Sequence, residues 1–164
     1  MSRPLHSLIL CLVVPVFALL LSSCSLGYQS SYNKSTQAWK QKRHQMGGPW
    51  EGIWKSKTSG HTGKLWCIVT KPAAGSGNVW DFDYKAEWSA VSGRFHFRQA
   101  PINPANKRSL RFKGEKDLGP LGGKFQVNML LQHDVLQASY TSKNDKGTFL
   151  LFRPESKQAR KQKR

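Results

Sequence analysis

Acidic residues, metal-ligand patterns and catalytic motifs are scarce in this sequence. Nine Asp and Glu stand against 26 Lys and Arg, which gives a formal net charge of +17 at pH 7. The chain contains no Cys-x-x-Cys, His-x-His or His-Glu-x-x-His pattern and no Gly-x-Ser-x-Gly nucleophile elbow. Its acidic residues fall at turns or polar strand positions, whereas a glycosidase needs one acid in an apolar pocket. We therefore expect no metal, no cofactor and no catalytic residue, and a protein that is not an enzyme.

Long apolar runs are also lacking, apart from one near the N-terminus. It extends from Leu8 to Leu21, 14 residues, after the basic residue Arg3 and before small serines. At about 1.5 Å rise per residue this run is too short to cross the ~30 Å hydrocarbon core as a helix. Pro15 also interrupts helical hydrogen bonding there. The pattern predicts a cleaved signal peptide over residues 1–23.

The end of this run has a distinctive four-residue sequence. Leu21-Ser22-Ser23-Cys24 resembles the bacterial lipobox, and no A-x-A-like site of ordinary secretory cleavage is present. The resemblance implies cleavage before Cys24 and lipid attachment to its sulfur. Ser25 is not the aspartate that retains enterobacterial lipoproteins at the inner membrane, so we expect the periplasmic face of the outer membrane. An ordinary secretory signal is the alternative.

Positive charge is concentrated at the two ends of the mature chain. Residues 25–49 hold four bases and no acid, and residues 153–164 hold six bases and one acid. Basic segments near a membrane gain roughly 1 kcal/mol per Lys or Arg from an anionic surface, so anionic lipid or another envelope polyanion is the expected partner. A solvated surface without a dedicated partner is the alternative, and a secreted protein is not expected to meet nucleic acid. The residues assigned to anionic-surface contacts are Lys34, Lys40, Lys42, Arg43, Arg160, Lys161, Lys163 and Arg164.

The mature chain divides into three parts by composition. Residues 24–49 are polar, show no sustained period and end in two glycines and a proline, which predicts an acylated cysteine followed by a flexible basic tether. A short helix over 36–45, with Trp39 against the domain, is the less favoured alternative. One folded domain is predicted over 50–153 and a basic tail over 154–164. Cys67 has no disulfide partner once Cys11 is removed and Cys24 is acylated, and its apolar neighbours predict a buried thiol.

Alternation of apolar and polar residues marks the folded domain as all-β. From Trp80 to Trp88 every second residue is apolar, so one strand face is predicted to be buried. Eight strands in an antiparallel meander suit a barrel, because closure removes exposed edges; a two-sheet sandwich is the runner-up. The predicted strands are 50–57, 64–70, 80–88, 93–99, 109–113, 124–132, 135–142 and 148–153.

Two stretches carry a resemblance within this domain. Trp50-Glu51-Gly52-Ile53-Trp54 resembles the Gly-x-Trp opening of lipocalin-like and avidin-like barrels, where a tryptophan closes one barrel end. The glycine-rich stretch 114–123 and the stretch 145–149 resemble small bacterial secreted and lipoprotein β-domains, which implies fold and location only. The glycines at 114–123 precede a predicted strand, which favours a turn over a phosphate-binding loop.

Aromatic residues at alternate strand positions are predicted to fill the barrel or to enclose one small ligand. The sequence is compatible with three functions. The first is an envelope lipoprotein whose non-catalytic barrel binds or scaffolds while its basic ends contact anionic surfaces. The second is a calycin-like carrier of a small apolar ligand, with Trp54, Trp80, Tyr84 and Trp88 as ligand-binding residues. The third is an inhibitor or assembly partner of a periplasmic enzyme, acting through loops such as 114–123.

Overall fold

The computed structural model describes residues 27–41, 46–75, 77–89, 91–103, 109–117 and 123–154. These residues form one helix, 27–41, and eight strands. The strands are β1 (Gly48–Ser56), β2 (Thr62–Thr70), β3 (Trp80–Trp88), β4 (Val91–Gln99), β5 (Ser109–Asp117), β6 (Lys124–Gln132), β7 (Val135–Thr141) and β8 (Lys146–Phe152).

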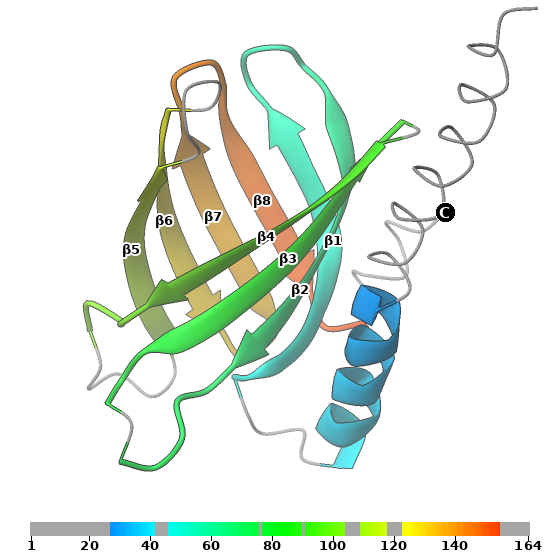
Figure 1. Cartoon of the computed structure of the whole chain (residues 1–164), viewed down its shortest axis with the longest axis vertical. Helices are drawn as coiled ribbons and strands as arrows, with labels where there is room; N and C mark the ends of the chain where they lie inside the picture. The colour runs from blue at the N-terminus through cyan, green and yellow to red at the C-terminus, as the bar shows by residue number, and fades with distance from the viewer. Residues whose placement is uncertain are drawn as a thin grey trace, which may run out of the picture. The chain divides into compact units, whose positions relative to one another are not determined.

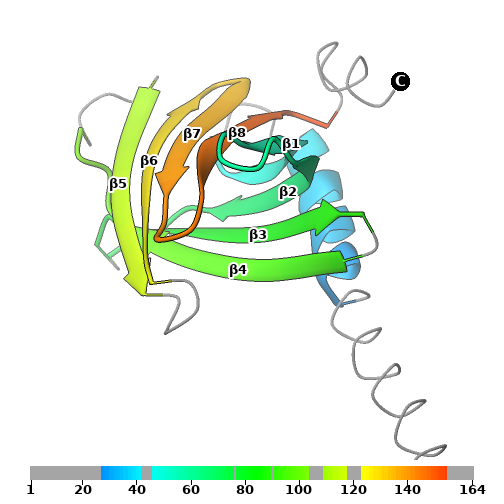
Figure 2. The ribbon, with the colours of Figure 1, turned by 90° about the horizontal axis from the view of Figure 1, so that it is seen from above.

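The eight strands form one antiparallel sheet in the order β4-β3-β2-β1-β8-β7-β6-β5 (Figure 1). Strands that follow one another in the chain are hydrogen-bonded neighbours, except β4 and β5, and the first strand pairs with the last, with Glu51 opposite Phe152. The sheet therefore curves around a common interior (Figure 2). The predicted all-β meander is confirmed, and its form is a nearly closed barrel.

The barrel is incomplete between β4 and β5, and we call this place the seam. One isolated bridge joins Pro101 to Phe112, at the end of β4. Farther along, the Lys116 ammonium group donates to the carbonyl oxygen of His96 at 3.1 Å. Inside the seam the amide group of Gln99 fills the space where a Cβ at Gly114 would lie. β4 and β5 share no ladder of backbone hydrogen bonds, and side-chain contacts connect them instead.

The observed strands agree with the predicted ones to within two residues at nearly every end. β5 is the exception, because it continues to Asp117 where the sequence predicts a glycine-rich loop from residue 114. Gly114 to Asp117 pair with Val127 to Lys124 of β6, so this part of the expected loop is strand. The rest of that loop, 118–122, lies outside the described residues.

The helix 27–41 lies where the sequence predicts a flexible tether without regular structure, and that prediction is wrong for these residues. Trp39 is the side chain that makes the end of this helix part of the domain. A Cβ on Gly48 would lie 2.9 Å from its ring, and the Arg153 guanidinium carbon is 4.9 Å from its ring centroid. Such tertiary contacts stabilise a helix whose own apolar content is low.

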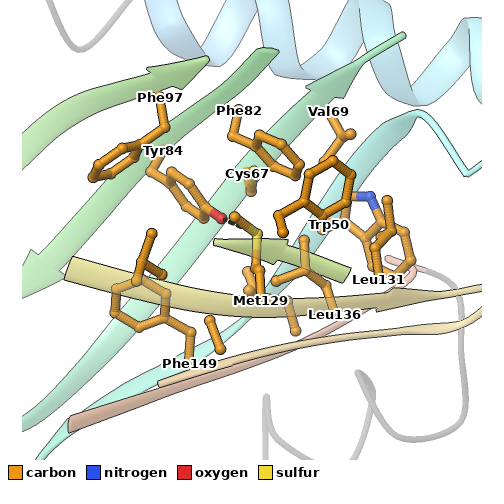
Figure 3. Packing of buried hydrophobic residues seen from close by; sticks show 14 of the residues in the cluster. Trp50, Cys67, Val69, Phe82, Tyr84, Phe97, Met129, Leu131, Leu136 and Phe149 are labelled. Atoms are coloured by element: carbon orange, nitrogen blue, oxygen red, sulfur yellow. Dashed lines mark hydrogen bonds between the residues drawn. The ribbon is translucent and has the colours of Figure 1, made fainter. Parts of the chain in front are cut away.

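One half of the barrel interior is packed solid. Trp80, Phe82, Tyr84 and Ala86 of β3 are buried as predicted, and Phe82 and Tyr84 are at most 1% exposed. The prediction is wrong for Trp88, which is 40% exposed at the end of the strand, and for Lys85, which is buried on the other face. Cys67 is fully buried beside them, which confirms the predicted interior thiol, and burial raises its pKa. The Tyr84 hydroxyl donates to the sulfur of Met129 at 3.2 Å (Figure 3). Other side chains of this packed half are Trp50, Leu65, Val69, Leu131, Leu136 and Leu151.

Candidate functional site

One end of the barrel is sealed by Trp50 and Arg153. The Trp50 side chain is fully buried, and the Arg153 guanidinium carbon lies 3.7 Å from its ring centroid. The guanidinium also donates to the carbonyl oxygens of Met46, Gly47 and Pro49 at 3.0, 3.1 and 3.2 Å. Arg153 directly follows β8, and its guanidinium hydrogen-bonds to the segment that leads into β1. It therefore joins the start and the finish of the barrel sequence at this end of the interior. We call this the sealed end.

The opposite end contains a cavity of about 410 Å³, and we call it the mouth cavity. It lies between the turn that joins β1 to β2 and the turn that joins β7 to β8, above the packed half of the interior. Its lining is mostly aromatic. The lining residues are Trp54, Ser59, His61, Leu65, Ala86, Trp88, Phe95, Phe97, Phe125, Tyr140, Asp145 and Phe149.

Five of the lining rings form a closed circuit of contacts, which we call the aromatic circuit. The pairs Phe95–Phe97, Phe97–Phe125 and Phe125–Tyr140 have centroid distances of 5.9, 5.5 and 5.4 Å. The circuit closes through Tyr140–Phe149 at 5.1 Å and Phe149–Phe95 at 6.4 Å. Ring contacts at such distances are favourable beyond the area that they bury. The circuit therefore gives the cavity walls that do not depend on a ligand.

Trp54 and Trp88 form a second aromatic wall. Their rings meet edge to face at 6.1 Å, and Trp88 is 40% exposed at the rim. The indole Nε1 of Trp54 donates to the carbonyl oxygen of Glu87 at 3.3 Å. Gly63 permits this approach, because a Cβ there would lie 1.9 Å from that oxygen. The Trp54 ring is thus fixed by the backbone of two neighbouring strands.

Asp145 is the acidic group of the cavity lining, and the hydroxyl groups of neighbouring side chains hold it. Its Oδ1 accepts from the Ser56 hydroxyl at 2.6 Å, and its Oδ2 accepts from the Tyr140 hydroxyl at 2.7 Å. Burial raises the pKa of Asp145, but the hydrogen bonds from Ser56, Tyr140 and Thr58 outweigh burial and hold that pKa below its ordinary value. Burial and the neighbouring carboxylate raise the pKa of Tyr140. Asp145 is therefore ionised and Tyr140 neutral at pH 7.

The structure brings two of the four predicted ligand-binding aromatics to the mouth cavity. Trp54 and Trp88 line it. Tyr84 is 1% exposed and stacks on Phe95 at 4.9 Å, so it lies behind the lining. Trp80 packs edge to face on Phe112 at 6.0 Å, toward the other end of β3. Tyr140 and the four phenylalanines of the aromatic circuit are the main lining residues that the predicted set omits.

The residues predicted to contact membranes are mostly outside the described part of the chain. Lys34 and Lys40 are exposed on the helix 27–41. The remaining ones, together with the predicted lipid-attachment residue Cys24, lie outside the described residues. They are Lys42, Arg43, Arg160, Lys161, Lys163 and Arg164.

The mouth cavity is suited to binding, since its rings face an open space and its two hydroxyl groups are engaged elsewhere, that of Tyr140 with Asp145 and that of Ser59 with Ser56. Within the described ranges, no three His, Cys, Asp or Glu side chains gather as a metal site would require. No helix in that part of the chain combines the length and apolar character needed to span a membrane. Comparison with protein-family models, curated proteins and solved structures gives no match for this chain.

Proposed function

We propose that this protein binds a small, largely apolar ligand in the mouth cavity of its barrel. The observation that carries the proposal is the cavity itself: about 410 Å³ lined by seven aromatic side chains at one end of a barrel whose other end is packed and sealed. Sites for small molecules are typically apolar hollows of roughly 300–1,000 Å³ with a few polar groups. A ligand that covers these rings gains roughly 25 cal/mol per Å² of apolar surface removed from water.

The preformed walls support binding rather than collapse. Rings that contact one another around a circuit, and a Trp54 ring fixed by a backbone hydrogen bond, do not have to be ordered when a ligand enters. Preorganised sites lose less conformational entropy on binding. Ala86, 8% exposed on β3, gives the cavity part of its space because its side chain is so small.

Filling part of the cavity should weaken binding without removing any of the aromatic side chains that line it. Ala86→Leu adds three carbon atoms inside the cavity, and Ser92→Leu, which replaces an exposed residue on neighbouring β4, is the matched control. We expect Ala86→Leu to weaken binding of phenylbutanol, a neutral aromatic probe, at least tenfold, with Ser92→Leu within twofold of wild type. Titration calorimetry measures both, and circular dichroism checks the fold. Equal affinity of wild type and Ala86→Leu would refute the proposed function.

We further propose that lipid on Cys24 anchors the protein at the periplasmic face of the bacterial outer membrane. The lipobox-like Leu21-Ser22-Ser23-Cys24 and the short apolar run before it support this location. Metabolic labelling with a palmitate analogue should label wild type and the control Cys11→Ala, but not Cys24→Ala. Labelling of Cys24→Ala to the wild-type level would show that lipid is attached at another residue, and no labelling of wild type would show that the lipid anchor is absent.

A further inference from the structure

The mouth cavity has a negative charge in its lining although the whole chain is strongly positive, and this difference indicates the charge of the ligand. The chain carries +17, yet among the described residues that line the cavity there is one carboxylate, Asp145, and no Lys or Arg. The other polar residues of the lining are Ser59 and His61 at the turn after β1 and the Tyr140 hydroxyl. An anionic ligand drawn to the protein surface would therefore meet a like charge inside the cavity.

The hydrogen bonds of Asp145 fix the carboxylate without neutralising it. Its donors are the hydroxyl groups of Ser56 at 2.6 Å, of Tyr140 at 2.7 Å and of Thr58, together with the backbone N–H of Lys146. None of these donors is charged, so the negative charge of Asp145 acts on whatever fills the cavity.

The aromatic lining favours the same sign of ligand charge. The face of an aromatic ring carries partial negative charge and attracts ammonium or guanidinium groups within about 6 Å of the centroid. This protein already uses such contacts: the Lys116 ammonium lies 5.8 Å from the centroid of Phe97, a member of the aromatic circuit, and Arg153 lies over Trp50 at the sealed end. Inside the cavity, the Trp54–Trp88 pair and the aromatic circuit surround the space beside Asp145.

We infer that the ligand of the mouth cavity has a cationic group, a protonated amine or a quaternary ammonium, on an apolar body. The apolar body covers the aromatic circuit, and the cationic group lies among ring faces near the Asp145 carboxylate. This inference rests on the proposed binding function and specifies its ligand class. Discrimination against anions follows from the same groups, because a carboxylate or phosphate would have to be desolvated beside a fixed negative charge.

Three probes with one apolar body test this inference: phenylbutylamine, phenylbutanol and phenylbutyrate, which are cationic, neutral and anionic at pH 7. The full chain in lipid nanodiscs is titrated with each by calorimetry, with empty nanodiscs as the blank. We expect the amine to bind about tenfold tighter than the alcohol, from one desolvated cation–π and carboxylate interaction. The carboxylate probe should bind more weakly than the alcohol.

Asp145→Asn removes the charge and nearly preserves the shape of the side chain, and it should reduce the amine preference to the part that the ring faces provide. Asp134→Asn makes the same charge change at the turn between β6 and β7, near the sealed end, and should keep the amine preference. Binding of the alcohol by Asp145→Asn reports whether the cavity is intact. If that variant does not fold, the ranking of the three probes on wild type decides by itself.

The outcomes separate the two proposals. If no probe binds wild type, the proposed function fails together with the inference. If the alcohol binds and the amine is no tighter, or the carboxylate is tightest, the function stands and the inference is overturned. An amine preference that survives unchanged in Asp145→Asn overturns the role given to that carboxylate.

Discussion

Arg153 concentrates more contacts than any other polar side chain described above. It is 2% exposed, its guanidinium lies over the ring of Trp50 and over the ring of Trp39, and it donates to the backbone of the segment that leads into β1. The sequence predicts this residue as part of the basic end of the chain. A count of charges cannot distinguish a buried arginine from an exposed one, because burial depends on carbonyl groups some 100 residues away in the sequence.

Replacing Arg153 by Met should therefore lower the free energy of unfolding by about 3 kcal/mol or more, because buried carbonyl oxygens lose their donors and two rings lose a cation. Arg153→Lys should restore only part of this, since an ammonium group lacks the planar fork of donors. Urea unfolding followed by tryptophan fluorescence measures both. The control Arg98→Met, at an arginine 68% exposed beside Asp81, should change stability by less than about 1 kcal/mol. Similar losses for the two Met variants would contradict the structural role of Arg153.

Asp145 and Tyr140 should make stability depend on pH at opposite ends of the scale. The pKa of Asp145 is lowered from 3.8 on folding, so its contribution is complete above about pH 3.8 and is lost as the pH falls through the folded-state pKa. The pKa of Tyr140 is raised above 10.0, so its contribution is complete below pH 10.0 and is lost as the pH rises beyond it.

Urea unfolding across the pH scale checks this for wild type, Asp145→Asn and Tyr140→Phe. The first variant should lose the part of the acid dependence that comes from residue 145, and the second should flatten the alkaline fall. Their differences from wild type should be largest near neutral pH. A wild-type pH profile in both variants would show that neither group is coupled to folding.

At the scale of elements, the strands were predictable and their depth in the barrel was not. Period-two alternation places Trp80, Tyr84 and Trp88 on one face of β3, and all three do point inward or to the rim. Alternation contains no information on position along the barrel axis, so it could not show that Trp80 belongs to the packed half and Trp88 to the mouth. A helix in this region was the less favoured alternative, because the segment shows no sustained apolar period. The expected contact of Trp39 with the domain is present, but the helix covers 27–41 rather than 36–45, and Tyr28 and Tyr32 are buried on it as well.

The seam between β4 and β5 was likewise not predictable, because it depends on which strands fail to pair. Gln99 is 6% exposed there, and neither its amide nitrogen nor its amide oxygen has a hydrogen-bond partner among the described residues. A buried amide without partners costs about 1–3 kcal/mol. The seam therefore contains a local cost to stability that a different side chain could remove.

Gln99→Met has nearly the same shape without the polar atoms, and we expect it to raise the free energy of unfolding by about 1 kcal/mol. Gln137→Met, at an exposed position of β7, is the control and should leave stability unchanged. Thermal and urea unfolding measure both variants. A loss of stability in Gln99→Met would mean that the amide group forms hydrogen bonds after all, for example to water.

At the scale of the whole molecule, the burial of Arg153 removes one of the six C-terminal bases from the exposed surface and leaves five in the predicted tail. Residues 155–164 contain five bases and Glu155, a net charge of +4, so their removal lowers the formal charge from +17 to +13. We propose that these bases hold the tail against anionic lipid, where each is worth roughly 1 kcal/mol close to the surface. The tail bases are Lys157, Arg160, Lys161, Lys163 and Arg164.

Changing these five bases to Gln, at unchanged length, should weaken binding to phosphatidylglycerol vesicles at least tenfold at low salt and reduce the sensitivity of binding to salt. Vesicle co-sedimentation measures the effect, and phosphatidylcholine vesicles give the charge-independent background. A variant with five exposed threonines and serines changed to Gln serves as the control. If the Gln variant binds phosphatidylglycerol vesicles as tightly as wild type, the bases of the tail do not contribute to membrane binding.

The sealed end also sets a direction for ligand exchange. β1 begins and β8 finishes there, side by side, so the chain enters and leaves the barrel at the end opposite the mouth. Ligand exchange through the mouth therefore does not require Arg153 to release the backbone that it holds.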